Sequence, residues 1–256
     1  MTRFSELLGT DFDGEPTSDI DDVIYGAFDE PGHRDRVPGL VELMNDPAEP
    51  EIERFLACVA LTYWGEAAGY EAVLRAAADP RNTPWYDFSI DRKFSVDCTF
   101  AQLADAVADR DLTQEKGTEG LRLEAARALV RLADSEYFED KLGELFDSAT
   151  MLALLDDIKE VVGRGVRSLA AGEKYRFELS TQLVDLASGV SAVDGPLGVE
   201  LAMSVLNVAS HPRALKHAVP VVGRAKGPEG RQFGEYLMSI GDEKVQQQVR
   251  ETLNGV

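Results

Sequence analysis

PEIERFLACVALTYWGEAAGYEAVLRAAADP, residues 50–80, predicts one helix, a tight turn and a second helix. The first helix is expected over residues 51–64, because its apolar side chains fall on one stripe at helical spacing. Gly65 then ends it. The second helix begins near Gly69 and stops at Asp79-Pro80, since proline cannot donate the next helical hydrogen bond. The stretch therefore predicts two short antiparallel helices.

The same pattern recurs along the chain. A shift of about thirty-three residues carries the second helix of one unit onto that of the next, which is the period of stacked helical repeats. It places Val37, Leu40, Val41, Asp46 and Pro47 on Tyr70, Val73, Leu74, Asp79 and Pro80. A shift of about sixty-eight, close to two periods, places Arg54, Ala57, Ala60 and Leu61 on Arg122, Ala125, Ala128 and Leu129.

Two segments carry a resemblance to a known family. ERFLACVALTYWGE (residues 53–66) and RLEAARALVRLAD (residues 122–134), with the helices after them, resemble the HEAT and armadillo-like helical repeat proteins. The likeness is clearest over residues 19–147. It implies helical hairpins stacked as an α-α superhelix, a solenoid, and a protein that binds other macromolecules. The family has no common active site that could be assigned to residues of this chain.

Further helices are predicted along the rest of the chain, and no alternating strand pattern of useful length is found, so the predicted fold class is all-α. We expect an irregular acidic arm over residues 1–18 and one helical-repeat domain over 19–256, with less regular repeats over 148–256. Asp19 is expected to begin a helix. Later helices are expected over 100–108, 118–133 with Thr118 as its cap, 137–146, 151–162 with a break at Gly163-Arg164-Gly165, 175–188, 197–209, 212–224, 230–240 and 244–253.

Composition limits the class of protein. A chain of 256 residues with 44% hydrophobic content can bury a sizeable core. Its longest apolar run, residues 57–64, is too short to cross a bilayer, and no signal peptide pattern follows Met1. We therefore expect a cytoplasmic protein with no membrane partner. The two cysteines, Cys58 and Cys98, are too few for a disulfide framework, and Cys58 is expected to be a buried free thiol.

Charge is the second informative feature. The chain has 46 acidic and 26 basic residues, a formal net charge of −20. Residues 1–50 contain 13 Asp and Glu against 3 Arg, whereas residues 211–256 have a slight basic excess. A negative field repels nucleic acid, because phosphate binding requires Lys and Arg. It attracts a basic protein and speeds their encounter. The alternative is that the acidity only aids solubility.

Residues 81–94 interrupt the repeats and hold the only cluster of aromatic side chains in a polar, proline-bounded stretch. Insertions between repeats often lie on the binding face, and Trp and Tyr often anchor interfaces. We predict that Trp85 and Tyr86, next to Asp87, contact a partner. Phe88 and Phe94 are expected to turn back over the helix ends as a local core.

The sequence contains no catalytic or metal-binding signature. Asp11 to Asp22 superficially matches an EF-hand loop, but Pro16 stands where that loop needs glycine and Asp22 where it needs glutamate. His33 is expected at the surface of a turn, and the spacing of His211 and His217 does not suit one metal on one helical face. No Cys-x-x-Cys pair, phosphate-binding glycine loop or nucleophile elbow is present. No cofactor is therefore predicted, and an enzymatic role has no residue to support it.

These observations favour a non-enzymatic protein-binding module whose acidic face docks a basic protein. Size, charge and architecture also resemble the immunity proteins of bacterial toxin systems, which block a basic toxin, commonly a nuclease. That resemblance implies occlusion, with Trp85 and Tyr86 giving apolar anchorage and acidic side chains pairing with the partner's Lys or Arg. The acidic candidates are Asp19, Asp21, Asp22, Asp29 and Glu30. The alternative is a general scaffold or regulatory adaptor without a toxin partner.

Overall fold

The structure is a computed structural model that describes residues 2–88, 90–91 and 96–255. Nearly all regular structure in these residues is helical, so the predicted all-α class is confirmed. The first helices are α1 (Arg3–Leu7), α2 (Ile20–Gly26), α3 (His33–Asn45), α4 (Glu51–Tyr63), α5 (Ala67–Ala78), the 3-10 helix η1 (Pro80–Asn82), α6 (Thr99–Ala108), α7 (Thr113–Lys116) and α8 (Glu119–Val130). They are followed by α9 (Leu142–Leu145), α10 (Ser148–Ala153), α11 (Leu155–Ala170), α12 (Leu179–Ser191), α13 (Gly195–Leu206), α14 (Pro212–Arg224), α15 (Gly227–Ile240) and α16 (Glu243–Gly255). The strands β1 (Ile90–Asp91) and β2 (Val96–Asp97) pair with each other.

The chain divides into two compact units. Unit 1 comprises Met1–Ile90 and Gln102–Ala128, and unit 2 comprises Asp91–Ala101 and Leu129–Val256. The division therefore passes through α6 and α8, at positions that no change of composition marks in the sequence. It does not coincide with residue 147, where the predicted regular repeats end.

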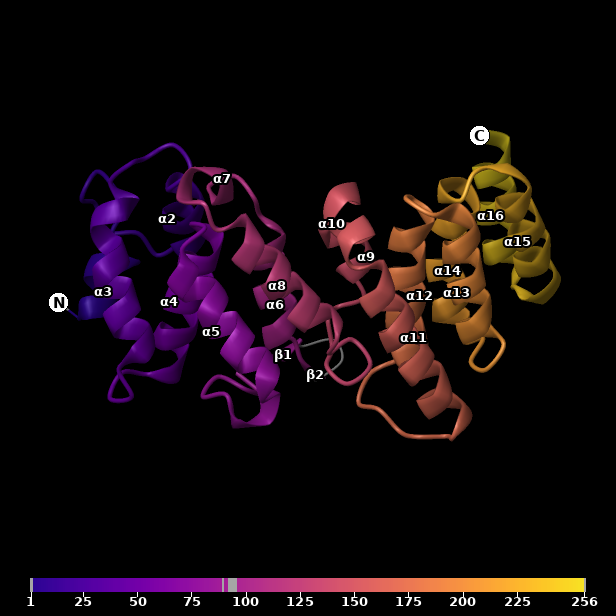
Figure 1. The fold of residues 1–256 in the computed structure, drawn as a ribbon, viewed down its shortest axis with the longest axis horizontal. Helices are drawn as coiled ribbons and strands as arrows, with labels where there is room; N and C mark the ends of the chain where they lie inside the picture. Colours follow the sequence, from indigo (N-terminus) through magenta and orange to yellow (C-terminus); the bar gives the residue numbers. More distant parts are fainter. Residues whose placement is uncertain (1, 89, 92–95, 256) are drawn as a thin grey trace. The chain divides into compact units, whose positions relative to one another are not determined.

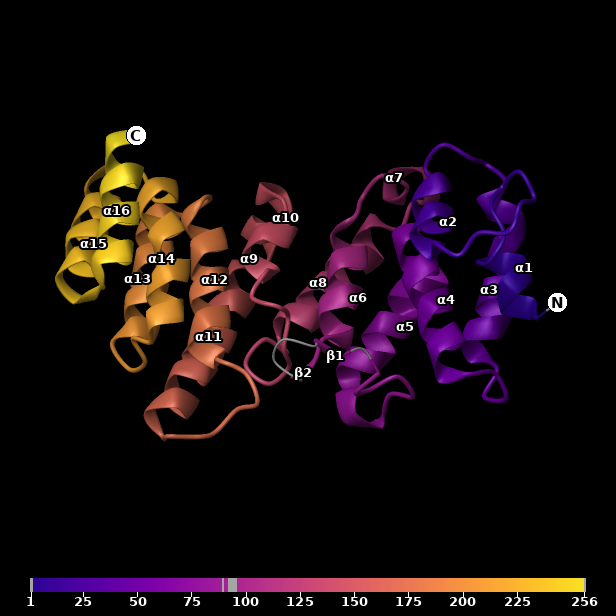
Figure 2. The ribbon, with the colours of Figure 1, turned by 180° about the vertical axis from the view of Figure 1, so that it is seen from behind.

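The predicted hairpin of residues 50–80 forms the centre of unit 1. α4 and α5 agree with the predicted helices, and α3, α4 and α5 lie side by side (Figures 1 and 2). Gly65 ends α4 as predicted, because its φ of 69° is the left-handed conformation that favours glycine. The Glu66 N–H then bonds to the Leu61 carbonyl at 2.9 Å. Leu61 and Trp64, both fully buried, place this end of α4 in the core.

The amino-terminal arm is more ordered than predicted. α1 lies within it, and Thr10 pairs with Pro16 across an isolated antiparallel bridge. Arg36 of α3 holds the arm: its guanidinium donates to the carbonyls of Leu7, at 2.9 Å, and of Thr10 and Asp11. The same guanidinium lies 4.3 Å from the centroid of the Phe12 ring.

Unit 2 is organised around α12. Every residue of this helix is buried, including polar side chains, and α12 contacts α9, α11, α13 and α14. The buried polar residues have specific partners: Gln182 donates to the carbonyls of Ala133 and Glu136 at 2.7 and 2.8 Å and accepts from the Phe138 N–H at 2.7 Å. α12 therefore fixes the segment that follows α8.

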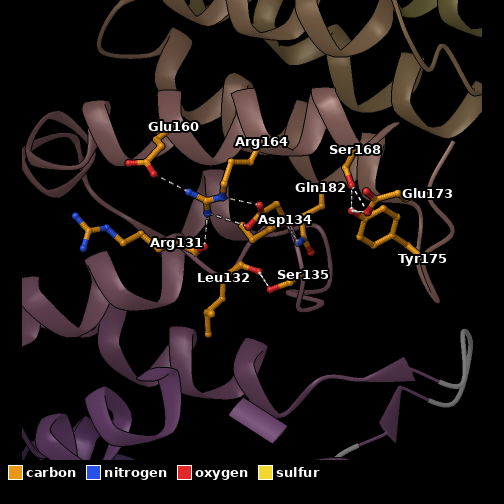
Figure 3. A network of polar contacts seen from close by, with 11 residues as sticks. Arg131, Leu132, Asp134, Ser135, Glu160, Arg164, Ser168, Glu173, Tyr175 and Gln182 are labelled. Atoms are coloured by element: carbon orange, nitrogen blue, oxygen red, sulfur yellow. Dashed lines mark hydrogen bonds and ion pairs between the residues drawn. The ribbon is translucent and has the colours of Figure 1, made fainter. Parts of the chain in front are cut away.

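The predicted helix over residues 137–146 is wrong, and only α9 is helical there. Gln182 binds the Phe138 amide, and Glu139 and Asp140 both have a φ of 55°, which a right-handed helix cannot contain. Figure 3 shows the preceding segment, where Arg164 of α11 donates to Asp134 at 2.8 and 3.0 Å and to the Arg131 carbonyl at 2.7 Å. These long-range contacts replace the local helical bonds.

The predicted break at Gly163-Arg164-Gly165 is also wrong, because α11 continues through it to Ala170. Instead, the predicted helix 151–162 is interrupted earlier, where Leu154 separates α10 from α11. Thr118 takes the predicted position before α8, where its carbonyl accepts the Arg122 N–H at 3.0 Å, but its hydroxyl donates to the Gly65 carbonyl at 2.7 Å. By contrast, α14 has the predicted bounds, and Asp19 caps α2 as predicted.

Both cysteines are buried free thiols, which confirms the prediction for Cys58. Cys58 lies in unit 1 and Cys98 in unit 2. Burial raises the pKa of the Cys58 thiol to about 12, although a hydrogen bond with Thr62 opposes the shift. Within the residues that the structure describes, no helix has the length and apolar character needed to cross a membrane.

Candidate functional site

The predicted acidic residues gather around α2. The Asp19 carboxylate accepts the Asp21 N–H at 3.1 Å and begins the helix, and Asp21 and Asp22 follow in its first turn, where the helix dipole favours negative charge. Val23 and Ile24 are buried against the rest of unit 1. The other face of α2 is therefore acidic and directed to solvent.

None of these carboxylates is neutralised within the described residues. All five predicted acids are exposed and form no ion pair there; they are Asp19, Asp21, Asp22, Asp29 and Glu30. The cations that follow in the sequence have other partners, since Arg34 pairs with Glu115 and Arg36 holds the amino-terminal arm. The negative electrostatic field of this surface can therefore act on a partner.

Tyr25 lies among these acids, and the sequence analysis missed it. Its side chain is 46% exposed, and it lies three and four residues after Asp22 and Asp21, on the same face of α2. The ring is held edge-on to Tyr63 at 5.4 Å, and Tyr63 donates to Asp105. The sequence did contain an indication of this, because Tyr25 falls outside the buried helical stripe that contains Val23 and Ile24.

The loop after α5 differs from its prediction. Trp85 is 5% exposed and packs on Phe55, with ring centroids 6.0 Å apart, whereas Phe88 is 38% exposed. Trp85 therefore points inward, contrary to its prediction. Phe88 is more exposed but packs on Phe55 with ring centroids 6.3 Å apart, as its prediction expected, and Phe94 lies outside the described residues. Tyr86 is half-buried and Asp87 is exposed. Trp85 also lines a cavity of about 300 Å³ with Arg54, Arg75 and Asp79 among its walls.

The structure does not bring the predicted acids and aromatics together. The α2 region contacts Tyr63 and Trp64 at the end of α4, and the Trp85 loop contacts Phe55 near its beginning. Phe55 and Tyr63 are about 12 Å apart along the helix axis at 1.5 Å per residue. The acidic surface and the Trp85 loop are thus two separate regions of unit 1.

His33 was expected at the surface but is buried. Its ring packs against Trp64 with centroids 5.4 Å apart, and its Nδ1 donates to the Glu30 carbonyl at 2.8 Å. Nε2 accepts from the Lys116 ammonium at 3.2 Å, and this ammonium also pairs with Glu66. The prediction failed because Trp64 and Lys116, both distant in the sequence, meet the His33 ring in the folded chain. His33 is a packing residue that supports the turn carrying Glu30.

Metal chemistry finds no support in the described parts of the chain, where no group of three His, Cys, Asp or Glu could hold an ion. The EF-hand-like segment uses its first carboxylate for local structure, since Asp11 accepts the N–H groups of Asp13 and Glu15 at 3.0 and 2.8 Å. His211 is exposed and His217 is half-buried in unit 2.

Unit 2 contains a second polar feature, the α12 cavity, with a volume of about 270 Å³. Buried Asp185 and Ser188 come from α12, and exposed Lys216 and Pro220 come from α14. The complete lining is Asp140, Glu144, Asp185, Ser188, Lys216, His217 and Pro220. Burial, reinforced by the charges of Asp140 and Glu144, raises the pKa of the Asp185 carboxyl to about 7, although the Gly143 N–H opposes the shift.

Serine, histidine and aspartate line this cavity, but they do not form a catalytic triad. The Ser188 hydroxyl accepts from Arg224 at 2.9 Å, and no described residue hydrogen-bonds to the His217 ring. A nucleophile must be within hydrogen-bond reach of its base. The arrangement therefore lacks the contact that acyl transfer requires.

The charge, exposure and packing of these two regions are the basis for assigning a function. Comparison with protein-family models, with curated proteins and with solved structures found no match.

Proposed function

We propose that this chain is a non-enzymatic protein-binding module whose α2 acidic surface docks a basic protein. The name α2 acidic surface denotes Asp19, Asp21, Asp22, Tyr25, Asp29 and Glu30. One observation carries the proposal: five exposed carboxylates without cation partners among the described residues lie at the start of α2 and in the turn after it, on either side of the exposed Tyr25 in the sequence. Such a combination joins long-range attraction with a short-range anchor.

The two components have different roles in docking. The carboxylates steer a basic partner toward the surface, which raises the association rate and makes it fall with salt. Tyr25 then contributes apolar area, because its ring is already fixed by Tyr63 and loses little freedom on binding. Tyr86 and Asp87 remain predicted contacts of a separate region, and the buried ring of Trp85 offers little surface to a partner.

The proposal includes stacked helical hairpins as the framework for this surface. Contacts between successive helices support it: α3 with α4 and α4 with α5 in unit 1, and α12 with α13 and α14 with α15 in unit 2. Nearest-neighbour contact is the general feature of helical repeats. A toxin-neutralising role would use the surface to occlude a basic toxin or nuclease. The scaffold alternative is favoured by the division into two units, each able to present its own surface.

The first experiment is affinity capture from native lysate with the wild-type chain and with a charge-reversed variant, at low and high salt. We expect a basic protein that the wild type retains at low salt and releases as salt rises, since exposed charges are screened. The proposal requires that the charge-reversed variant fail to retain the same protein.

The charge reversal Asp21→Lys with Asp22→Lys tests the mechanism directly. We expect the association rate with the captured partner to fall by at least about tenfold at low salt, because the reversal replaces attraction by repulsion. Stopped-flow mixing at several salt concentrations measures it. Lysines in the first turn of α2 also oppose the helix dipole, so Asp29→Lys with Glu30→Lys, outside the helix, serves as a second variant.

Glu71→Lys with Glu124→Lys is the matched control. Both glutamates are exposed, lie on α5 and α8 of unit 1, and give the same change in net charge. We expect this control pair to lower the association rate much less than either pair of reversals in the α2 acidic surface. Equal reductions would mean that net charge alone governs binding, and an association rate insensitive to salt and to all three reversals would exclude docking through the α2 acidic surface.

A further inference from the structure

The α12 cavity contains hydrogen-bond acceptors that the protein leaves unused. Asp185 is 5% exposed and lies on its floor. Its Oδ2 accepts the Gly143 N–H at 2.8 Å, but no described residue donates a hydrogen bond to Oδ1. Oδ1 is therefore open to a donor that enters the cavity, and an ionised carboxylate on a residue this buried carries a desolvation cost.

A second acceptor comes from the backbone of α14. Pro220 lies inside this helix and has no N–H, so the Lys216 carbonyl lacks the donor that a regular helix supplies four residues later. Lys216 and Pro220 both line the cavity. The Lys216 side chain is exposed, and a lysine side chain can extend its ammonium into solvent.

His217 adds a third polar group. Burial, together with the charge of Arg213, lowers the pKa of this imidazole, so it is neutral at neutral pH. A neutral imidazole carries one donor and one acceptor nitrogen. Because no described residue hydrogen-bonds to the ring, both nitrogens are available to a ligand.

The charges around the cavity determine the sign of that ligand. Arg213 pairs with Asp140 at 2.6 Å, and Arg224 pairs with Glu144 at 3.2 Å. These two cations are therefore each balanced by a carboxylate. Asp185 has no ion-pair partner among the described residues. Lys216 also lines the cavity without an ion pair in the described part of the chain, but its side chain is exposed, whereas Asp185 is buried. The buried charge without a paired ion is therefore negative, and a bound cation would offset its burial.

We propose that the α12 cavity binds a small organic cation, whose primary ammonium or guanidinium group donates to Asp185 Oδ1 and to the Lys216 carbonyl. Both head groups carry several N–H donors, which can reach the two acceptors Asp185 Oδ1 and the Lys216 carbonyl together. The cavity volume of about 270 Å³ holds such a head group and a short alkyl chain.

Binding of a cation is linked to the ionisation of Asp185. The groups around this carboxyl are Asp140 and Glu144 on the α9 side and Arg213, Lys216, His217 and Arg224 on α14. Since the Asp185 pKa is about 7, the carboxyl is largely protonated at pH 6 and largely ionised at pH 8. A cation favours the ionised form, so its affinity should be about tenfold higher at pH 8 than at pH 6. Protonation of His217 at low pH also lowers the affinity for a cation, because the charged imidazole would repel it.

Calorimetric titration of the full chain with n-butylammonium and n-butylguanidinium chloride tests the proposal, with sodium butyrate as the anion of similar size. We expect saturable binding of at least one cation at pH 8 and none of butyrate. Asp185→Asn should weaken cation binding at least about tenfold, because the buried charge partner is lost. Circular dichroism establishes that the variant is folded.

Asp156→Asn is the matched control, since it removes the same charge from an exposed position on α11 in unit 2. We expect its affinity to stay within about twofold of the wild type. A readout independent of variants is the imidazole NMR signal of His217 in the wild type, which should shift on addition of the cation. The proposal is overturned if neither cation binds, if butyrate binds as well as they do, or if Asp185→Asn binds as tightly as the wild type.

Discussion

Gly143→Ala is expected to lower the free energy of unfolding of unit 2 by about 3 kcal/mol or more, at the upper end of overpacking effects. A Cβ at this position would lie 2.0 Å from the Asp185 carbonyl oxygen and 2.8 Å from its carbon. Both atoms belong to the backbone of α12, so a side-chain rotation cannot relieve the overlap. α9 and α12 would have to separate, which would also break the bond from the Gly143 N–H to Asp185.

Gly163→Ala is the control within the same unit. The nearest atom to its added Cβ is the flexible Arg167 side chain at 3.6 Å, which is ordinary contact. Inside α11 this change should stabilise by up to about 1 kcal/mol, because alanine is the better helix former. Urea unfolding followed by circular dichroism compares the two variants. Similar effects of both would show that the close approach of α9 and α12 does not exist in solution.

Asp185→Asn is expected to stabilise the protein at pH 8 and to have little effect at pH 4. In the folded protein the Asp185 pKa is raised from its ordinary 3.8 to about 7, so the native state holds this proton more tightly than the unfolded chain does. The free energy of unfolding of the wild type therefore falls as pH rises from about 3.8 to about 7. Above pH 7 the whole penalty for holding an ionised Asp185 in the folded state remains. Each tenfold change in proton affinity corresponds to about 1.4 kcal/mol, so the gain at pH 8 approaches about 4 kcal/mol.

The measurement is the difference in unfolding free energy between variant and wild type from pH 4 to pH 8. Taking the difference removes the contribution of the other carboxylates, which titrate in both proteins. Asp156→Asn is the control, because it makes the same substitution at an exposed position of α11, where the carboxylate pairs with Lys159. A flat difference for Asp185→Asn would mean that the buried carboxyl ionises normally.

The sequence was informative where local pattern determines structure. The bounds of α14 and the left-handed Gly65 were predictable, because apolar spacing and helix-ending residues act within a few positions. The predicted break at Gly163-Arg164-Gly165 failed because Gly165 serves packing: a Cβ there would lie 2.5 Å from a methyl carbon of Leu183 on α12. Local sequence cannot distinguish a glycine that ends a helix from one that admits a neighbouring helix.

Some features of the candidate sites also follow from local sequence, and others depend on contacts that form only in the folded chain. The exposure of Asp21 and Asp22 follows from the phase of Val23 and Ile24 on a short helix, which also could have indicated Tyr25. The burial of Trp85 and His33 depends on Phe55 and Trp64, which approach only in the folded chain. The α12 cavity joins residues of α9, α12 and α14 that are far apart in sequence, and no motif connects them.

The two thiols lie in different units, so thiol labelling can report local opening of each unit in one molecule. Thiol reagents attack the thiolate, and Cys58 is buried with a pKa of about 12, so it reacts only when its surroundings open. Cys98 is also buried and belongs to the other unit. Equal labelling rates of Cys58 and Cys98 would indicate that the two units open together. Different rates would show which unit opens more readily, without an added probe.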